Sequence, residues 1–434
     1  MKNKISKYNF LFQMENQQIL YNVNSDGIIL LDAELVNFIK SYRDNVDRLE
    51  QIHRHLYDEM KRQGMIVPIE CDEAEEVINN WKKKDNDLTR FTLTILPTLD
   101  CNLRCWYCYE EHKKGSNMSE KTFASICRLV DRILACEELK IFNLDFYGGE
   151  PLLVFNKTVY PLCQYISEEC EKHGKKMTLH FTTNGVLLTD EVRRKLLTLK
   201  LCKRPAFQIT MDGNKEMHNR SKCTASGKPT FDIVIRNIKA TLRDGMPVNN
   251  RFNYTSKTID SFRDLLDVYK DLTAEEKALL SFDFQQVWQE SHMKDDQEKA
   301  FRYAGDFIKE GYAVSTSKLF NKSRCPQEFN NNVSVNYDGC IYKCTAVNPT
   351  EGNRDGLLLS DGSICWEKSY DKWKEVKYGN ETCRRCKLFP LCHGGCTRTK
   401  LQINADKCVF AHNEQSIEKI ALGRLKTLLR NKIS

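Results

Sequence analysis

Alternating apolar and polar residues near the N-terminus predict a β-hairpin, because a period of two is the signature of half-buried strands. The two strands cover residues 8–14 and 17–23, and the polar pair Glu15-Asn16 lies between them. Their apolar positions include Phe10, Phe12, Met14, Ile19, Tyr21 and Val23. The pattern thus predicts an antiparallel pair at the start of the chain.

The next segments predict helices. Ser25-Asp26-Gly27 suits a turn into the apolar run Ile28–Leu31, and Asp32 is placed to cap a following helix. A second helix is predicted from about Asp47 to Gln63. Three strands and two or three helices predict a winged-helix-like domain over residues 1–70, followed by a linker helix over residues 71–90.

From Phe91 the rhythm changes to apolar strands with helical stretches between them. The strand candidates are Phe91–Leu96, Ile141–Tyr147, Met177–Thr182, Ala206–Met211, Asn249–Tyr254 and Ser281–Val287. This alternation predicts an α/β fold with a parallel sheet, closed or partly closed as a (β/α)6 TIM-like barrel over residues 91–315. Such barrels carry their chemistry at the C-terminal ends of the strands.

Residues 316–410 break into short segments rich in cysteine and glycine. Their irregular pattern predicts a domain that buries no ordinary core and depends on metal for its fold. Residues 411–434 predict a C-terminal helix over about 412–430.

Charge and hydropathy narrow the classes of partner. Lys and Arg number 66 against 59 Asp and Glu, a net charge of +7 without a basic run, which argues against nucleic acid. No stretch approaches the roughly 18 apolar residues of a membrane span. The charged N-terminus lacks the apolar region of a secretory signal, so we expect a cytoplasmic protein.

The 19 cysteines then need a reason other than disulfides, since cytosolic thiols stay reduced. Cysteines scattered singly along the chain are predicted to be small core residues; examples are Cys127, Cys136, Cys163, Cys170 and Cys202. Two groups remain, one from Cys101 to Cys108 and one from Cys325 to Cys408. Both groups predict metal sites or catalysis.

The first group follows the first barrel strand with the spacing C-x3-C-x2-C, formed by Cys101, Cys105 and Cys108. Three thiolates can hold one cubane iron–sulfur cluster and leave its fourth iron without a protein ligand. An open iron beside a barrel mouth can bind a substrate or cofactor directly. The alternative is a zinc site, which needs four ligands, and only His112 is a nearby candidate for the fourth.

This spacing, with the aromatic Tyr107 before the last cysteine, resembles the radical S-adenosylmethionine (SAM) superfamily. The resemblance implies that Cys101, Cys105 and Cys108 hold the catalytic [4Fe–4S] cluster and that SAM chelates its open iron. Electron transfer would then cleave SAM and release a 5′-deoxyadenosyl radical. The protein would supply placement and electrostatics.

Residues at later strand ends fit SAM binding. In the turn Phe146–Pro151, Gly148 and Gly149 allow close backbone approach, and a backbone edge with Glu150 can receive the methionyl ammonium. Asn184, at the end of the third strand, can bond polar parts of SAM. These turns are evidence for SAM binding only because they follow the cysteine triad in the sequence.

After the fourth strand, Thr210 and Arg220 are further candidates for SAM contact. The Arg220 guanidinium matches a carboxylate such as that of SAM. For Thr210, Asp212 and His218, a role in stabilising the turn stands beside cofactor contact.

The second cysteine group resembles the SPASM domain, the twin-cluster extension of radical SAM enzymes that act on peptides and proteins. The resemblance assigns an outer auxiliary cluster to Cys383, Cys386, Cys392 and Cys408, and an inner one to Cys325, Cys344 and Cys396. The inner cluster lacks an obvious fourth ligand. Either Cys340 fills the place, or an iron stays open for a substrate thiolate.

The resemblance implies a radical SAM oxidoreductase that matures a ribosomally synthesised peptide and installs a C–S or C–C cross-link. It implies three [4Fe–4S] clusters, SAM, a precursor peptide with a leader sequence, and an electron donor such as flavodoxin or ferredoxin. Residues 1–70 resemble leader-binding recognition domains; the alternative is a packing or dimerisation domain.

Two other functions stand beside this one. An anaerobic sulfatase-maturating enzyme would form formylglycine, but such relatives begin their barrel near the N-terminus, whereas here the first barrel strand begins only at Phe91. A non-catalytic iron–sulfur or zinc protein is disfavoured by the intact triad and the Gly-Gly-Glu-Pro turn.

Overall fold

The computed structural model describes residues 2–14, 17–290, 294–315, 324–403 and 406–433. Packing divides the chain into two compact units. Unit 1 contains Met1–Asn86, Ser317–Glu328 and Asp371–Ser434, and unit 2 contains Asp87–Thr316 and Phe329–Tyr370. Unit 1 therefore contains segments from both ends of the chain. The sequence analysis instead divided the chain into five consecutive segments, and their assignment as separate domains stays a prediction.

Unit 2 is built on one sheet, which has eleven strands within the described residues, in the order β12-β11-β10-β9-β8-β7-β6-β13-β14-β15-β16. The predicted strands are β6 (Arg90–Leu96), β7 (Ile141–Phe146), β8 (Lys176–Thr183), β9 (Ala206–Met211), β10 (Val248–Tyr254) and β11 (Leu280–Gln286). All six are parallel neighbours in chain order. The predicted α/β fold with a partial barrel is confirmed.

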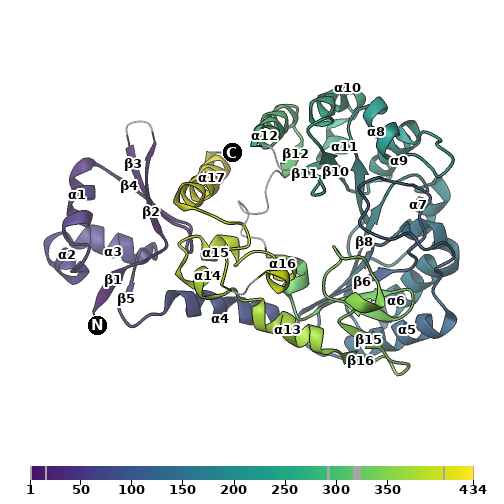
Figure 1. The fold of residues 1–434 in the computed structure, drawn as a ribbon, viewed down its shortest axis with the longest axis horizontal. Coiled ribbons are helices and arrows are strands. Elements are labelled where there is room, and N and C mark those ends of the chain that lie inside the picture. The colour runs from purple at the N-terminus through teal and green to yellow at the C-terminus, as the bar shows by residue number, and fades with distance from the viewer. Residues whose placement is uncertain (1, 15–16, 291–293, 316–323, 404–405, 434) are drawn as a thin grey trace. The chain divides into compact units, whose positions relative to one another are not determined.

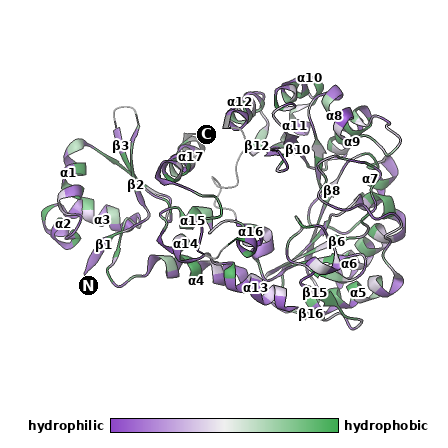
Figure 2. Cartoon of the chain, viewed as in Figure 1, coloured by the Kyte–Doolittle hydropathy of each residue, from purple (hydrophilic) through white to green (hydrophobic). Residues whose placement is uncertain are grey.

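Helices connect these strands and cover the outer face of the sheet (Figure 1). They are α5 (Glu120–Leu134), α6 (Tyr160–Lys172), α7 (Asp190–Leu197), α8 (Lys215–Ser221), α9 (Phe231–Arg243), α10 (Leu265–Val268), α11 (Ala274–Leu279) and α12 (Lys294–Lys309). Figure 2 shows both polar and apolar residues along helices such as α7 and α12, as expected of amphipathic helices. No helix in the described ranges is long and apolar enough to cross a membrane.

The strands of unit 2 alternate sharply between two faces. On the outer face Phe146, Phe181 and Phe207 stack across three strands, with ring centroids 5.1 and 5.5 Å apart. The inner face is polar, and its side chains include Thr94, Asn143, Asp145, Thr178, His180, Gln208, Thr210, Asn249, Arg251 and Asp283. Period-two alternation thus buries the apolar face against helices and leaves a polar barrel interior.

The sheet continues beyond the predicted barrel. The added strands are β12 (Ala313–Ser315), β13 (Asn332–Asn336), β14 (Cys340–Tyr342), β15 (Gly356–Leu358) and β16 (Ile364–Trp366). Val333, Val335 and Ile341 are buried in the main core of unit 2. The prediction that the segment after about residue 320 buries no ordinary core is therefore wrong for this part, because its short strands pair with β6 and with one another.

Unit 1 contains the predicted hairpin as β2 (Asn9–Met14) and β3 (Gln17–Asn22), extended by β4 (Gly27–Leu31). The predicted turn at Glu15-Asn16 lies outside the described residues. Asp32 caps α1 (Ala33–Ser41), as predicted, by accepting a hydrogen bond from the Leu35 N–H at 2.8 Å.

Two features of the N-terminal segment differ from the prediction. The single helix expected over 47–63 is two helices, α2 (Val46–Ile52) and α3 (Arg54–Arg62). They break at His53, whose backbone leaves the helical region at φ −142° and whose Nδ1 accepts from the Leu56 N–H. A short antiparallel pair, β1 (Asn3–Ile5) with β5 (Ile66–Pro68), raises the strand count above three.

The predicted linker helix is present as α4 (Glu73–Asp85). The rest of unit 1 contains α14 (Glu381–Arg385), α15 (Phe389–Cys392), α16 (Thr397–Gln402) and α17 (Glu414–Ile433), and α13 (Lys368–Val376) begins in unit 2 and ends in unit 1. One core joins the hairpin, α4, the cysteine segment and α17; its buried side chains include Tyr8, Phe10, Tyr21, Trp81, Cys383, Phe389 and Leu425. The linker helix is therefore a core element of unit 1.

Candidate active site

The loop after β6 carries the cysteine triad and is held at its start by short polar contacts. The Ser116 hydroxyl accepts from the Leu99 N–H at 2.8 Å, and the Asp100 carboxylate accepts from the Cys101 N–H at 2.8 Å. Thr98, which precedes them, is fully buried. These contacts bring Cys101 to the C-terminal end of the sheet, where the sequence placed it.

All three triad cysteines are free thiols, and each has a donor or ring nitrogen near its sulfur. The Leu103 N–H donates to Cys101 Sγ at 3.4 Å, and the Lys222 ammonium donates to Cys105 Sγ at 3.6 Å. The His112 Nε2 lies 3.5 Å from Cys108 Sγ. Burial raises the pKa of the Cys101 thiol to about 12, so this thiol is protonated until a metal or another cation binds it.

The donor set fits an iron–sulfur cluster. Within the described ranges no three His, Cys, Asp or Glu side chains are grouped to hold a single metal ion. A cubane cluster binds each thiolate through a different iron, so its ligands need not converge on one point. Hydrogen-bond donors aimed at sulfur are the surroundings that such clusters use.

A buried polar group stands behind the triad. The Tyr107 hydroxyl donates to both oxygens of Asp212, at 2.8 and 2.9 Å. The Lys222 ammonium lies 5.7 Å from the Tyr107 ring centre. Burial opposes the charge of Lys222, but Cys105, Tyr107 and Asp212 raise its pKa well above the ordinary value. Lys222 is thus a buried cation beside the triad.

Sequence reasoning missed Lys222 and chose Arg220 two residues earlier. The Arg220 guanidinium pairs with Glu216 at 2.6 Å and its side chain is 70% exposed. It lies on a pocket of about 420 Å³ that Trp106, Tyr107 and Asp212 also line. Arg220 therefore borders a cavity at the triad, while the cation that touches a triad sulfur is Lys222.

The Gly-Gly-Glu-Pro turn packs tightly against the triad loop. Gly149 has φ +23°, and a Cβ there would lie 2.2 Å from the Asp100 carbonyl oxygen. The Glu150 N–H donates to that same oxygen at 2.8 Å. Only glycine fits this close approach between two backbones.

Glu150 is fully buried, and its carboxylate is bonded within the chain. It accepts from the Leu152 N–H at 3.0 Å, the Thr183 hydroxyl at 2.7 Å and the Asn184 N–H at 2.8 Å. The side chain thus ties the end of β7 to the end of β8. A carboxylate has about four acceptor sites, so these three bonds leave room for another donor, and contact of Glu150 with a methionyl ammonium stays a prediction.

Asn184 lies beside the triad: its side-chain amide donates to Asn102 Oδ1 at 2.7 Å and to Cys101 Sγ at 3.8 Å. Thr210 lies on the inner face of β9, in register with Arg251. His218 is buried, and its Nε2 lies 3.2 Å from the Thr230 hydroxyl, a contact that suits stabilisation of the turn.

The four predicted outer-cluster cysteines lie in unit 1 and interact electrostatically with one another. The Leu388 N–H donates to Cys386 Sγ at 3.4 Å. A Cβ on Gly379 would lie 2.9 Å from Cys383 Cβ, and one on Gly394 would lie 3.6 Å from Cys383 Sγ. Thiols, a donor and a glycine-lined backbone together fit a cluster at this place.

The predicted inner-cluster cysteines are divided between the units, with Cys325 and Cys396 in unit 1 and Cys344 in unit 2. Cys340 is buried on β14 in a small apolar cluster against which Cys344 packs. Burial raises the pKa of the Cys340 thiol to about 11. Cys340 and Cys344 are therefore close neighbours, and ligation by Cys340 stays a prediction.

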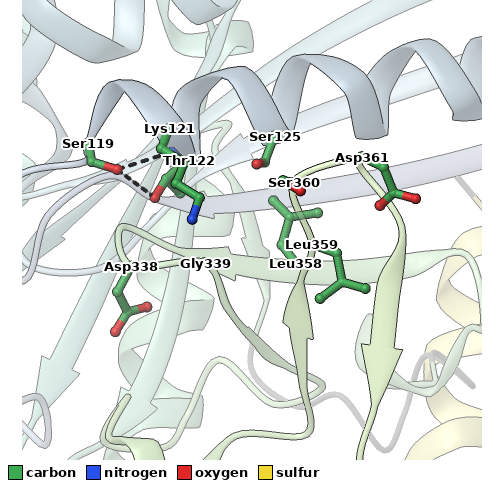
Figure 3. Close-up of a pocket in the computed structure, with 10 residues that line it drawn as sticks. All are labelled: Ser119, Lys121, Thr122, Ser125, Asp338, Gly339, Leu358, Leu359, Ser360 and Asp361. Carbon is green, nitrogen blue, oxygen red and sulfur yellow. Dashed lines mark hydrogen bonds between the residues drawn. The ribbon is translucent and has the colours of Figure 1, made fainter.

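Another pocket, of about 580 Å³, lies between the N-terminal part of α5 and the turns that follow β13 and β15 (Figure 3). The Ser119 hydroxyl caps α5 by accepting from the Thr122 N–H at 3.1 Å. None of the predicted site residues lines this pocket.

Comparisons with known proteins agree with this geometry. Residues 95–269 match the family model of the Radical SAM superfamily. A cysteine-type anaerobic sulfatase-maturating enzyme of Clostridium perfringens (strain 13 / Type A) is 23% identical, over 69% of this chain and 86% of that enzyme. The radical SAM cyclopropyl synthase TigE of Paramaledivibacter caminithermalis is 21% identical, over 90% of this chain and 89% of the synthase.

Solved structures show the same fold. Native anSMEcpe with bound AdoMet and the Kp18Cys peptide has a TM-score of 0.60 and 22% identity, covering 79% of this chain and 99% of that one. Streptococcus suis SuiB bound to precursor peptide SuiA has a TM-score of 0.52 and 17% identity, covering 93% and 98%. The family match spans the triad, the end of β6 and the strands from β7 to β10, and we conclude that residues 95–269 of this chain form a radical SAM domain.

Proposed function

We propose that this enzyme matures a ribosomally synthesised peptide by installing a C–S or C–C cross-link. The observation that carries the proposal is the segment before β6, which forms a hairpin sheet with helices and packs into one core with the outer-cluster cysteines. The similarity to TigE, named a cyclopropyl synthase, covers 90% of the chain and therefore includes part of this segment.

Each residue near the triad would have a distinct role. Cys101, Cys105 and Cys108 would hold a [4Fe–4S] cluster, which with SAM supplies reductive cleavage and a 5′-deoxyadenosyl radical. Lys222 balances thiolate charge at Cys105, and the turn at Gly149 brings backbone close to the triad loop.

We further propose two auxiliary clusters, which would bring the iron content to about 12 per chain. The outer one uses the four cysteines that gather in unit 1, and the inner one uses Cys325, Cys344 and Cys396, with Cys340 or a substrate thiolate as the fourth ligand. Replacing the three triad cysteines with Ala should remove about four irons and abolish 5′-deoxyadenosine formation with dithionite. A triple variant that still forms 5′-deoxyadenosine would overturn the assignment of the triad.

The N-terminal sheet offers a place for a leader peptide. Among the described residues β4 pairs only with β3, so its other edge is open. An extended peptide can add to such an edge through main-chain hydrogen bonds, with side-chain pockets giving selectivity. A leader held there would keep the core peptide at high effective concentration.

Formylglycine formation is the second candidate, favoured by the likeness to a sulfatase-maturating enzyme over 69% of the chain. Mass spectrometry of the product separates the two. Incubation of the reconstituted enzyme with a precursor peptide should remove two hydrogens from the peptide and leave its sulfur in place. Loss of the cysteine sulfur with gain of an aldehyde would instead identify formylglycine and refute the cross-link.

A further inference from the structure

Tyr8 carries a buried hydroxyl without a partner. The side chain is fully buried, and in the described part of the chain its hydroxyl makes no hydrogen bond. Its main chain is satisfied, since the carbonyl accepts from the Val23 N–H at 3.1 Å and the N–H donates to the Ser6 hydroxyl at 3.2 Å. A buried hydroxyl without a partner loses its hydrogen bonds to water and gains none in return, so an acceptor is expected at this place.

The surroundings of Tyr8 point to sulfur as that acceptor. Tyr8 belongs to the same buried core as Cys383, and Cys386 and Cys392 pack against this core. Glu73, Asp72 and Cys386 interact electrostatically with the Tyr8 phenol, and the Glu73 carboxylate already accepts hydrogen bonds from Ser6 and Lys7. The orphan donor therefore lies in the part of unit 1 where four thiols gather.

Helix α4 fixes Tyr8 in this position. The Glu73 carboxylate accepts from the Ser6 hydroxyl and, at 3.0 Å, from the Lys7 N–H. The Lys7 ammonium donates to the Arg384 carbonyl at 2.8 Å, and Arg384 pairs with Glu75 at 2.7 Å. The Ser6–Tyr8 turn and helix α14, which contains Cys383, thus both contact the N-terminal end of α4.

We propose that the Tyr8 hydroxyl donates a hydrogen bond to a sulfur of the outer auxiliary cluster, which is held by Cys383, Cys386, Cys392 and Cys408. The inference rests on the proposed outer cluster. In this proposal Tyr8, which belongs to the segment before the barrel, adjusts the reduction potential of an iron–sulfur cluster. A hydrogen bond to sulfur favours the reduced cluster and raises its reduction potential.

The test compares Tyr8→Phe with Tyr21→Phe, a matched control in the same core. Tyr21 is also fully buried, but its hydroxyl donates to Asp26 at 2.7 Å. Both variants carry the triad Cys→Ala changes, so that potentiometric EPR reads the auxiliary clusters alone. Tyr8→Phe should shift the potential of one auxiliary cluster to more negative values and leave the other unchanged, while Tyr21→Phe should shift neither.

A second measurement uses the sign of the effect on stability. Without iron, Tyr8→Phe removes an unsatisfied hydroxyl and should leave the protein as stable or more stable. With iron, it should release the outer cluster to a chelator several-fold faster. Tyr21→Phe should destabilise both forms alike, because it leaves Asp26 without that donor.

The outcomes separate the two hypotheses. Unchanged potential and unchanged iron release in Tyr8→Phe, at full iron content, overturn the role of Tyr8 alone. If Cys386→Ala does not lower the iron content by about four, the outer cluster is wrongly placed, and the inference fails with it.

Discussion

The Lys222 ammonium lies 3.6 Å from Cys105 Sγ and is only about 5% exposed as a residue. Asp212, 1% exposed, faces the same site and binds the Tyr107 hydroxyl through both oxygens. A buried cation and a buried carboxyl group therefore stand together behind the triad. Each stabilises the charged form of the other, and the cation also favours the thiolate that iron requires.

Lys222→Met keeps the side-chain volume and removes the charge. We expect the metal-free protein to lose roughly 3 kcal/mol of unfolding free energy, because Asp212 is left without its cation. Denaturant unfolding measures this loss, and iron titration should show weaker binding at the triad. Arg220→Met is the comparison for stability: its exposed pair with Glu216 is worth less than about 1 kcal/mol. A Lys222 variant as stable as the Arg220 variant would contradict the electrostatic interaction between Lys222 and Asp212.

Arg220→Met also tests the assigned SAM contact. If Arg220 binds the SAM carboxylate, the variant should keep its fold and bind SAM roughly tenfold more weakly, the loss expected for one charge-assisted hydrogen bond. Equilibrium binding to the reconstituted enzyme measures this. Unchanged SAM affinity would assign the carboxylate to another group; Lys222, which contacts Cys105 Sγ, is one candidate.

The polar barrel interior contains two groups whose titrations change the stability of the protein in opposite directions as pH rises. Asp145 on β7 is in register with His180 on β8, so both side chains lie on one face. Burial raises the pKa of the Asp145 carboxyl to about 6 and lowers that of His180 to about 4. The contribution of Asp145 to stability is present below pH about 4 and lost as pH rises through about 6, whereas that of His180 is lost as pH falls through about 4.

Between pH 4 and pH 6 these two slopes nearly cancel in the intact protein. In the metal-free enzyme, His180→Gln should leave only the contribution of Asp145, so the unfolding free energy should fall as pH rises. Asp145→Asn should leave only the contribution of His180, so the unfolding free energy should rise as pH rises. Either slope is at most roughly 1.4 kcal/mol per pH unit, the value for one proton. Urea unfolding across this range measures both, and variants that both parallel the wild type would refute the assignment.

The sequence predicted what local patterns determine. Six apolar strand runs with helical stretches between them predicted the parallel sheet of β6 to β11, and the cysteine triad was expected after its first strand. Asp32 was identifiable as a helix cap because capping is a contact over three residues.

What failed depends on contacts that are distant in sequence. Lys222 is one of 66 basic residues, and only the fold brings it to Cys105, 117 positions earlier. The break at His53 has no Gly or Pro to mark it, and β1 has only three residues, too few for a periodic signal. The core shared by Tyr8 and Cys383 likewise joins segments from the two ends of the chain.

The close approach at Gly149 predicts a sharp difference between two glycines. Gly149→Ala would place a Cβ 2.2 Å from the Asp100 carbonyl oxygen, and we expect a loss of roughly 3 kcal/mol from overpacking and backbone strain. Gly115→Ala is the control, since Gly115 also has a positive φ, +75°, but meets nothing within 4 Å. Its cost should be about 1 kcal/mol. Equal losses of unfolding free energy in the two variants would show that the approach is not tight.

Because the N-terminal sheet shares a core with the cysteine segment of unit 1, leader binding cannot be tested by deleting the sheet. Deleting residues 1–70 would remove Tyr8, Phe10 and Tyr21 from the core that contains Cys383. Each large apolar side chain contributes roughly 1.5–3 kcal/mol on burial, so we expect the deletion to lose the outer cluster as well as the leader site. Iron content and precursor affinity would then fall together, and the deletion could not assign the binding function to the sheet.

Point variants at the sheet avoid this coupling. Leu30, on the open-edged strand β4, is 56% exposed, and Leu11, on β2, is 42% exposed, so a charge at either position costs little stability. If a leader adds to β4, Leu30→Glu should weaken precursor binding roughly tenfold by losing one apolar side-chain contact. Leu11→Glu, at the opposite strand of the same sheet, should bind the precursor as the wild type does. Isothermal titration of both variants at matched iron content measures this, and equal affinity for all three proteins would place the leader elsewhere and remove the support that the N-terminal sheet gives to the peptide-maturase proposal.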